Sequence, residues 1–139
     1  MKHTKKRIAD AMVSCLQTMS LDSITVKKVC EVADINRSTF YTYYSSPCEL
    51  YAMIEKNFIE GLNIYLSELK SNPLSYPDFL KYMVTYTERN EKTYLALVKT
   101  NSASLKQTNT AHIEELGLWN LPQYNRYRNY AEEYIISVY

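Results

Sequence analysis

Glycine and proline are scarce in this sequence, which contains 2 glycines and 4 prolines in 139 residues. A β-sandwich or barrel needs a turn about every 8–12 residues, so the scarcity of turn formers argues against both. No stretch approaches the roughly 18 consecutive apolar residues of a membrane span. The basic N-terminus is not followed by the apolar run of a signal peptide. The composition predicts a soluble, cytoplasmic protein with no membrane partner.

Cysteine and histidine are also few and scattered. The three cysteines (Cys15, Cys30 and Cys48) show no C-x-x-C pair, and the histidines are His3 and His112. Structural zinc sites need four such ligands in paired spacing, so we expect no metal. Two glycines cannot build a glycine-rich phosphate loop, and no nucleophile–base pairing or carboxylate cluster is visible. We therefore expect neither a cofactor nor enzymatic activity.

Charge is unevenly distributed, although the whole chain has a formal net charge of +1. Residues 1–44 carry seven basic and four acidic side chains, whereas residues 45–139 carry nine basic and eleven acidic ones. This asymmetry indicates a polyanion-binding N-terminal end. The basic residues at positions 2–7 predict either an added attraction for DNA, including its minor groove, or a solvated tail.

Apolar residues recur with helical spacing along the chain, and no strand pattern competes with it. Thr4, Thr25, Asn36 and Ser46 are the expected N-caps, and Pro47 and Glu49 follow Ser46 as in a capping box. The predicted fold is all-α. The expected helices cover residues 4–19, 26–33, 37–43, 47–69, 77–89, 91–100, 103–116 and 122–138.

Three short helices followed by a long one are the layout of a helix-turn-helix domain, whose third helix enters the major groove. The predicted turn, residues 34–36, has the usual length. The helix that follows offers only hydrogen-bond donors and no acid, which suits an approach to phosphates. Those donors are Arg37, Ser38, Thr39, Tyr41 and Tyr43.

Residues 25–44 closely resemble the DNA-binding domain of the TetR family of bacterial transcriptional regulators. The likeness lies in the Thr25-Val26 cap, the turn, the Thr39-Phe40-Tyr41 triplet and the start of the next helix, and it extends over residues 4–55. Two positions depart from the family pattern: Asp34 replaces the glycine of the turn, and Pro47 replaces a lysine that touches a phosphate. Residues 76–139 resemble the family's ligand-binding and dimerisation domain more loosely.

The resemblance implies three segments: a DNA-binding domain (1–46), a connecting long helix (47–72) and a regulatory and dimerisation domain (73–139). It implies a homodimer that binds a palindromic operator as a repressor and is released by a small apolar or aromatic effector. A helical adaptor that binds only protein is the alternative. The family continues through another helix, so the sequence is interpreted either as incomplete or as a shortened member.

Individual residues receive roles on the same basis. Arg37 and Thr39 are the expected base contacts, because arginine can fork onto guanine and threonine can face thymine or donate its hydroxyl. Thr25, Lys27 and Tyr41 are expected at phosphates, while Ser38 and Tyr43 are less closely defined members of the DNA-binding set. Four tyrosines are candidates for an effector pocket, with core and dimer packing as the competing interpretation: Tyr82, Tyr86, Tyr94 and Tyr130.

Overall fold

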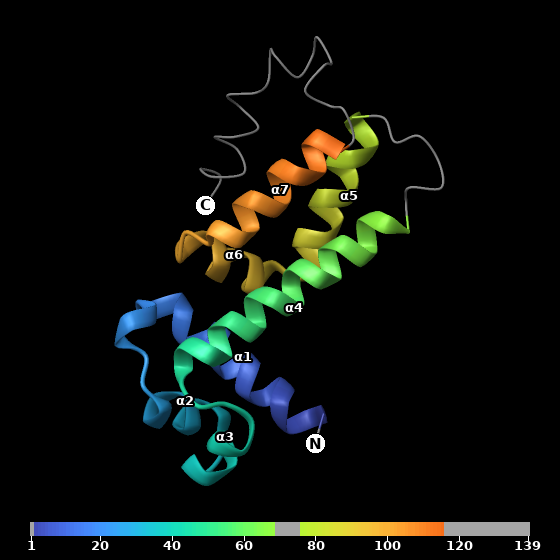
Figure 1. Ribbon diagram of the computed structural model, residues 1–139. Helices are drawn as coiled ribbons and strands as arrows, with labels where there is room; N and C mark the ends of the chain where they lie inside the picture. Colours follow the sequence, from blue (N-terminus) through green and yellow to red (C-terminus); the bar gives the residue numbers. More distant parts are fainter. Residues whose placement is uncertain (1, 69–75, 116–139) are drawn as a thin grey trace.

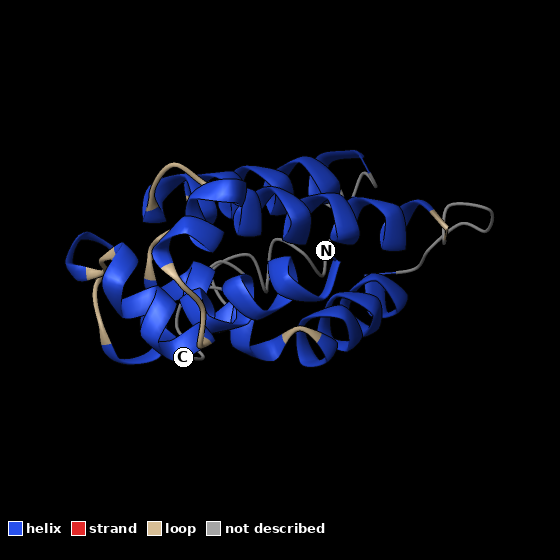
Figure 2. Ribbon diagram, turned by 90° about the horizontal axis from the view of Figure 1, so that it is seen from below, coloured by secondary structure: helices blue, strands red, loops and turns tan. Residues whose placement is uncertain are grey.

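A computed structural model describes residues 2–68 and 76–115, and within these residues the chain is all-helical (Figures 1 and 2). The predicted all-α class is therefore confirmed for the described part, whereas the expected helix at 122–138 lies outside it. The elements are α1 (Lys2–Thr18), the 3-10 helix η1 (Leu21–Ser23), α2 (Val26–Ala33), α3 (Arg37–Tyr43), α4 (Pro47–Ser67), α5 (Tyr76–Arg89), α6 (Glu91–Lys99) and α7 (Ala103–Glu115).

Helices α1, α2 and α3 pack around one apolar core. Ile8, Met12 and Leu16 of α1 lie at a spacing of four residues and are at most 1% exposed, as are Val29 of α2 and Phe40 of α3. Residues four apart lie on one face of a helix, so the amphipathic pattern of α1 translates directly into its buried side. Burying these side chains removes apolar surface from water, which is the main stabilising term for helices as short as α2 and α3.

Two of the expected helix caps are confirmed. The Thr25 hydroxyl accepts a hydrogen bond from the Lys28 N–H, and the Ser46 hydroxyl accepts one from the Glu49 N–H. Each bond satisfies a donor that the first turn of a helix leaves without a backbone partner. Pro47 occupies the first helical position of α4, where its missing N–H costs nothing.

Other cap predictions need correction. Helix α1 begins at Lys2, so Thr4 lies inside the helix and the basic N-terminal residues are helical instead of forming a tail. Asn36 is the N-cap residue of α3 but makes no side-chain capping bond. The Glu49 carboxylate accepts 2.5 Å bonds from the Ser45 hydroxyl and N–H, one residue before the capping-box position. These bonds, led by the hydroxyl, lower the pKa of Glu49.

Asp34 makes the turn between α2 and α3 in the left-handed conformation, with φ 53° and ψ 58°. This conformation is strained for residues with a Cβ, although aspartate tolerates it better than most. We expect Asp34→Gly to keep the stability of the protein, and Asp34→Val to lower the free energy of unfolding by roughly 1–2 kcal/mol. Urea denaturation followed by circular dichroism measures both, and equal stability of the two variants would contradict the expectation.

Helix α4 leads from the first three helices to α5, α6 and α7 (Figure 1). Its buried residues lie four apart and divide between two cores: Leu50 and Ile54 belong to the first, and Phe58 belongs to a second that includes Leu97. Helix α6 also contributes to both cores, because its Ala96 belongs to the first and its Leu97 to the second. Helix α4, the main described part of the segment 47–72 interpreted as a connector, therefore contributes directly to both cores.

A long-range polar contact also ties α6 to α1. The Lys99 ammonium donates to the carbonyl oxygens of Leu16 and Gln17, at 2.9 and 3.0 Å. These carbonyls lie at the C-terminal end of α1, which has no basic residue in its own last turn. A cation near a helix C-terminus is stabilising, so α6 supplies a cap that the sequence of α1 lacks.

Candidate nucleic-acid interface

Helix α3 presents most of the predicted DNA-binding side chains to solvent. Arg37 and Ser38 are exposed, Tyr41 is 56% exposed, and Thr39 and Tyr43 are half-buried. Phe40 is fully buried on the opposite side and packs α3 against the core formed with α1 and α2. This division follows from the helical period, since residues 37, 38 and 41 share a face that residue 40 does not.

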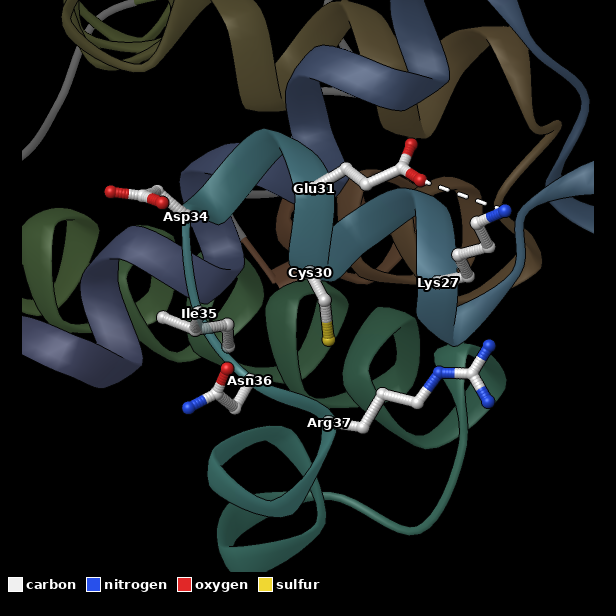
Figure 3. A pocket seen from close by; sticks show the side chains of 7 residues that line it. All are labelled: Lys27, Cys30, Glu31, Asp34, Ile35, Asn36 and Arg37. Atoms are coloured by element: carbon white, nitrogen blue, oxygen red, sulfur yellow. Dashed lines mark ion pairs between the residues drawn. The ribbon is translucent and has the colours of Figure 1, made fainter.

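A shallow, open cavity of about 410 Å³ lies where α2 meets α3 (Figure 3). In Figure 3 the side chains of Lys27 and Arg37 extend to the same side of it, and Asp34 extends to the other. Two of the predicted contact residues are thus brought to one cavity from different helices. Its lining is Lys27, Cys30, Glu31, Asp34, Ile35, Asn36 and Arg37.

Sequence reasoning did not identify Glu31 as part of this region. Its carboxylate lies 3.9 Å from the Lys27 ammonium, an i,i+4 pair along α2, and both side chains are more than half exposed. Such exposed pairs contribute little stability. The i,i+4 spacing of Lys27 and Glu31 predicts this ion pair from sequence. That the pair lies beside α3 depends on how α2 packs against α3, which the spacing does not predict.

The buried thiol of Cys30 faces the same cavity (Figure 3). Burial raises the pKa of Cys30, and the positive charge of Arg37 partly opposes this rise. The thiol is therefore neutral near pH 7 and behaves as a small apolar side chain. The Arg37 guanidinium is close enough to act on it electrostatically, which places this charge beside the turn.

Thr25 is exposed and is the N-cap residue of α2, two positions before Lys27. Its hydroxyl oxygen already accepts the capping bond from Lys28, but a hydroxyl also has a proton to donate. Thr25 and Lys27 thus offer a neutral donor and a cation at the N-terminal end of α2. This is a suitable combination for contacting a phosphate oxygen.

The N-terminal turns of α1 lie next to α3. The Lys5 ammonium is 5.6 Å from the centroid of the Tyr43 ring, a cation–π distance, while Lys2 and Lys6 are exposed. Lys5 therefore lies beside the last residue of α3, and Lys2 and Lys6 are exposed on the same helix as Lys5.

Three of the four candidate effector-pocket tyrosines are described, and they pack against other aromatic rings. Tyr94 stacks with Phe58 at 6.2 Å between ring centroids, Tyr86 meets Phe58 edge-on at 5.2 Å, and Tyr82 meets Tyr65 at 6.2 Å. The Tyr86 hydroxyl donates a 2.8 Å bond to the Phe58 carbonyl. These ring contacts are typical of core packing, the alternative to an effector pocket. Tyr130, the fourth candidate, lies outside the described residues.

A polar pair joins α4 to α7. His112 lies three residues, about one helical turn, after the buried Asn109, and its Nε2 is 2.7 Å from the Asn63 Oδ1. His112 is itself buried. Among residues 2–68 and 76–115, no group of three or more His, Cys, Asp or Glu side chains is arranged to hold a metal ion.

Comparison of the chain with protein-family models, curated proteins and solved structures gives no match. In the part of the chain that the structure describes, no helix combines the length and apolar character needed to cross a bilayer.

Proposed function

We propose that the chain is a sequence-specific DNA-binding transcriptional regulator of the TetR type that acts as a repressor. The observation that carries the proposal is the exposed face of α3, which begins with Arg37, carries no acidic side chain, and offers polar side chains that can all donate hydrogen bonds. Such a face can approach phosphates without repulsion and present an arginine to base edges in the major groove. The resemblance of residues 25–44 to the TetR family supports the same function.

In this proposal the contacts fall into two groups. Arg37 and Thr39 read bases, and the guanidinium of Arg37 forks onto O6 and N7 of a guanine. Thr25, Lys27 and Tyr41 bind phosphates, and Ser38 and Tyr43 complete the surface. Phosphate contacts set affinity and orientation, whereas base contacts set sequence preference, so the two groups are separable by experiment.

The proposal includes a homodimer on a palindromic operator. Two copies of α3 would enter successive major grooves when they lie about 34–36 Å apart. A small apolar or aromatic effector bound by the C-terminal helices would change this distance and weaken both half-site contacts together. The arrangement of α4 and α6, which contact both cores, supports such coupling.

The test is a selection of bound sequences from random duplex DNA, followed by fluorescence anisotropy over a salt series. Affinity should fall steeply with salt, because bound phosphates release condensed counterions. Arg37→Ala should cost about 1–3 kcal/mol on the preferred site and relax the base choice there. Lys27→Ala should weaken binding to all sequences nearly equally and flatten the salt dependence.

Three results would count against the proposal. A uniform loss in both variants would make Arg37 a backbone contact. A flat salt response between low and moderate ionic strength would contradict phosphate binding. Absence of binding to any duplex at low salt would favour the alternative, a helical adaptor that binds only protein.

A further inference from the structure

Arg7 of α1 is bound to the C-terminal end of α2. Its Nη2 donates to the carbonyl oxygens of Ala33 and Asp34, at 2.6 and 3.0 Å, and lies 4.0 Å from the Asp34 Oδ2. Ala33 is the last residue of α2 and Asp34 is its C-cap. One guanidinium therefore contacts both residues at which α2 ends.

These two carbonyls are among those that a helix terminus leaves without intrahelical donors. Within the same turn, the backbone N–H groups of Asp34 and Ile35 already serve the carbonyls of Cys30 and Glu31. Helix α2 has no basic residue in its last turn. Arg7 thus supplies, from another helix, both the missing donors and the positive charge that a helix C-terminus favours.

The contacts lie where the chain turns into α3. Asp34 is in the left-handed conformation, and Arg37, the first residue of α3, follows three positions later. Lys5, on the same helix as Arg7, meets the ring of Tyr43 at the other end of α3. Helix α1 therefore holds the segment from Asp34 to Tyr43 at both of its ends.

We propose that Arg7 is a positioning residue: it fixes the direction of α3, and thereby which bases Arg37 reaches, without itself binding phosphate. The inference rests on the proposed DNA-binding function. A bidentate arginine–guanine contact needs a defined approach, whereas a phosphate contact tolerates small shifts of a flexible cation. Loss of Arg7 should therefore reduce affinity for the preferred site more than affinity for unrelated DNA.

The experiment measures anisotropy of the full chain on the selected duplex and on an unrelated duplex, over a salt series. The variants are Arg7→Met, Arg7→Lys and, as a control of equal charge, Lys6→Met at the neighbouring exposed position. Arg7→Met should lower the ratio of specific to non-specific affinity by about tenfold or more. Lys6→Met should lower both affinities by one common factor, and Arg7→Lys, which keeps the charge, should recover part of the ratio.

Hydrogen exchange of the Asp34 and Ile35 amides gives a second measurement that needs no DNA. Both amides donate within this turn, so their exchange should be faster in Arg7→Met than in Lys6→Met, relative to core amides of α1. If Arg7→Met does not fold, Arg7→Lys serves for both measurements, because a lysine ammonium lies one bond closer to the backbone than the Arg7 Nη2 that makes these contacts.

The outcomes separate the inference from the proposed function. An equal loss on both duplexes with a flatter salt dependence would make Arg7 a phosphate contact and overturn the inference. An unchanged affinity ratio, or unchanged exchange at Asp34 and Ile35, would overturn it as well. If the wild-type chain binds neither duplex, the proposed function fails, and the exchange rates still decide whether Arg7 holds the turn.

Discussion

Replacing Phe40 by alanine is expected to lower the free energy of unfolding by about 3–5 kcal/mol, as truncation of a buried aromatic residue does elsewhere. The Phe40 side chain is fully buried and lies against Tyr44, with 5.9 Å between the ring centroids. Helix α3 has 7 residues, too few to be stable without packing. The loss should therefore remove the ordered α3 surface and, with it, the proposed DNA binding.

Urea denaturation followed by circular dichroism measures the stability, and anisotropy measures the binding. Tyr41→Ala is the matched control, because Tyr41 lies on the same helix but is more than half exposed. It should cost less than about 1 kcal/mol of stability and weaken DNA binding with the fold intact. A Phe40→Ala variant with wild-type stability would show that α3 is not held through this ring.

Much of this part of the fold could be predicted from local sequence. The spacing of Ile8, Met12 and Leu16 predicts the buried side of α1, and the Thr25 and Ser46 caps predict where α2 and α4 begin. The turn at residues 34–36 is likewise predicted from its place between two helical patterns. Each of these features depends on residues within one or two turns of each other, which is why periodicity and capping rules reach them.

Contacts between distant residues could not be predicted in this way. Arg7 and Ala33 are 26 positions apart, and Lys99 and Leu16 are 83 apart. Nothing in the local pattern distinguishes Arg7 from its basic neighbours, so it was grouped with them as a source of attraction for DNA. Its carbonyl partners become visible only when α1 and α2 are packed together.

Burial of individual apolar residues was also mispredicted where it depends on which neighbouring helix lies closest. Helical spacing predicts that Met53 and Val84 face inward, but they are 39% and 48% exposed. Met53 lies on α4 and Val84 on α5. The apolar face of each helix is wider than the area that the neighbouring described helices cover. For the candidate site, the helix-turn-helix layout and the resemblance predict the residues of α3, whereas Cys30 and Glu31 join them only through the packing of α2 against α3.

Phe58→Ala is expected to produce the second large loss, again about 3–5 kcal/mol, this time in the second core. The Phe58 side chain is 5% exposed and contacts the rings of Tyr86 and Tyr94. Gly61 allows this close approach, because a Cβ at that position would overlap the Tyr86 hydroxyl that bonds to the Phe58 carbonyl. The backbone and the two tyrosines are thus held in place, so the surroundings cannot collapse fully around the missing ring.

The size of this loss tests which interpretation of the tyrosines is right. The cost of truncating a core residue grows with the cavity it leaves, so a tightly packed cluster predicts the full loss in a urea titration. If Tyr86 and Tyr94 instead line an effector pocket that already contains free space, Phe58 has fewer contacts to lose. The cost would then fall below about 1.5 kcal/mol. Val84→Ala is the control on the same group of helices. Because the Val84 side chain is half-exposed, its truncation should change the free energy of unfolding by no more than about 0.5 kcal/mol. A small loss for Phe58→Ala would contradict the packed cluster and favour the pocket.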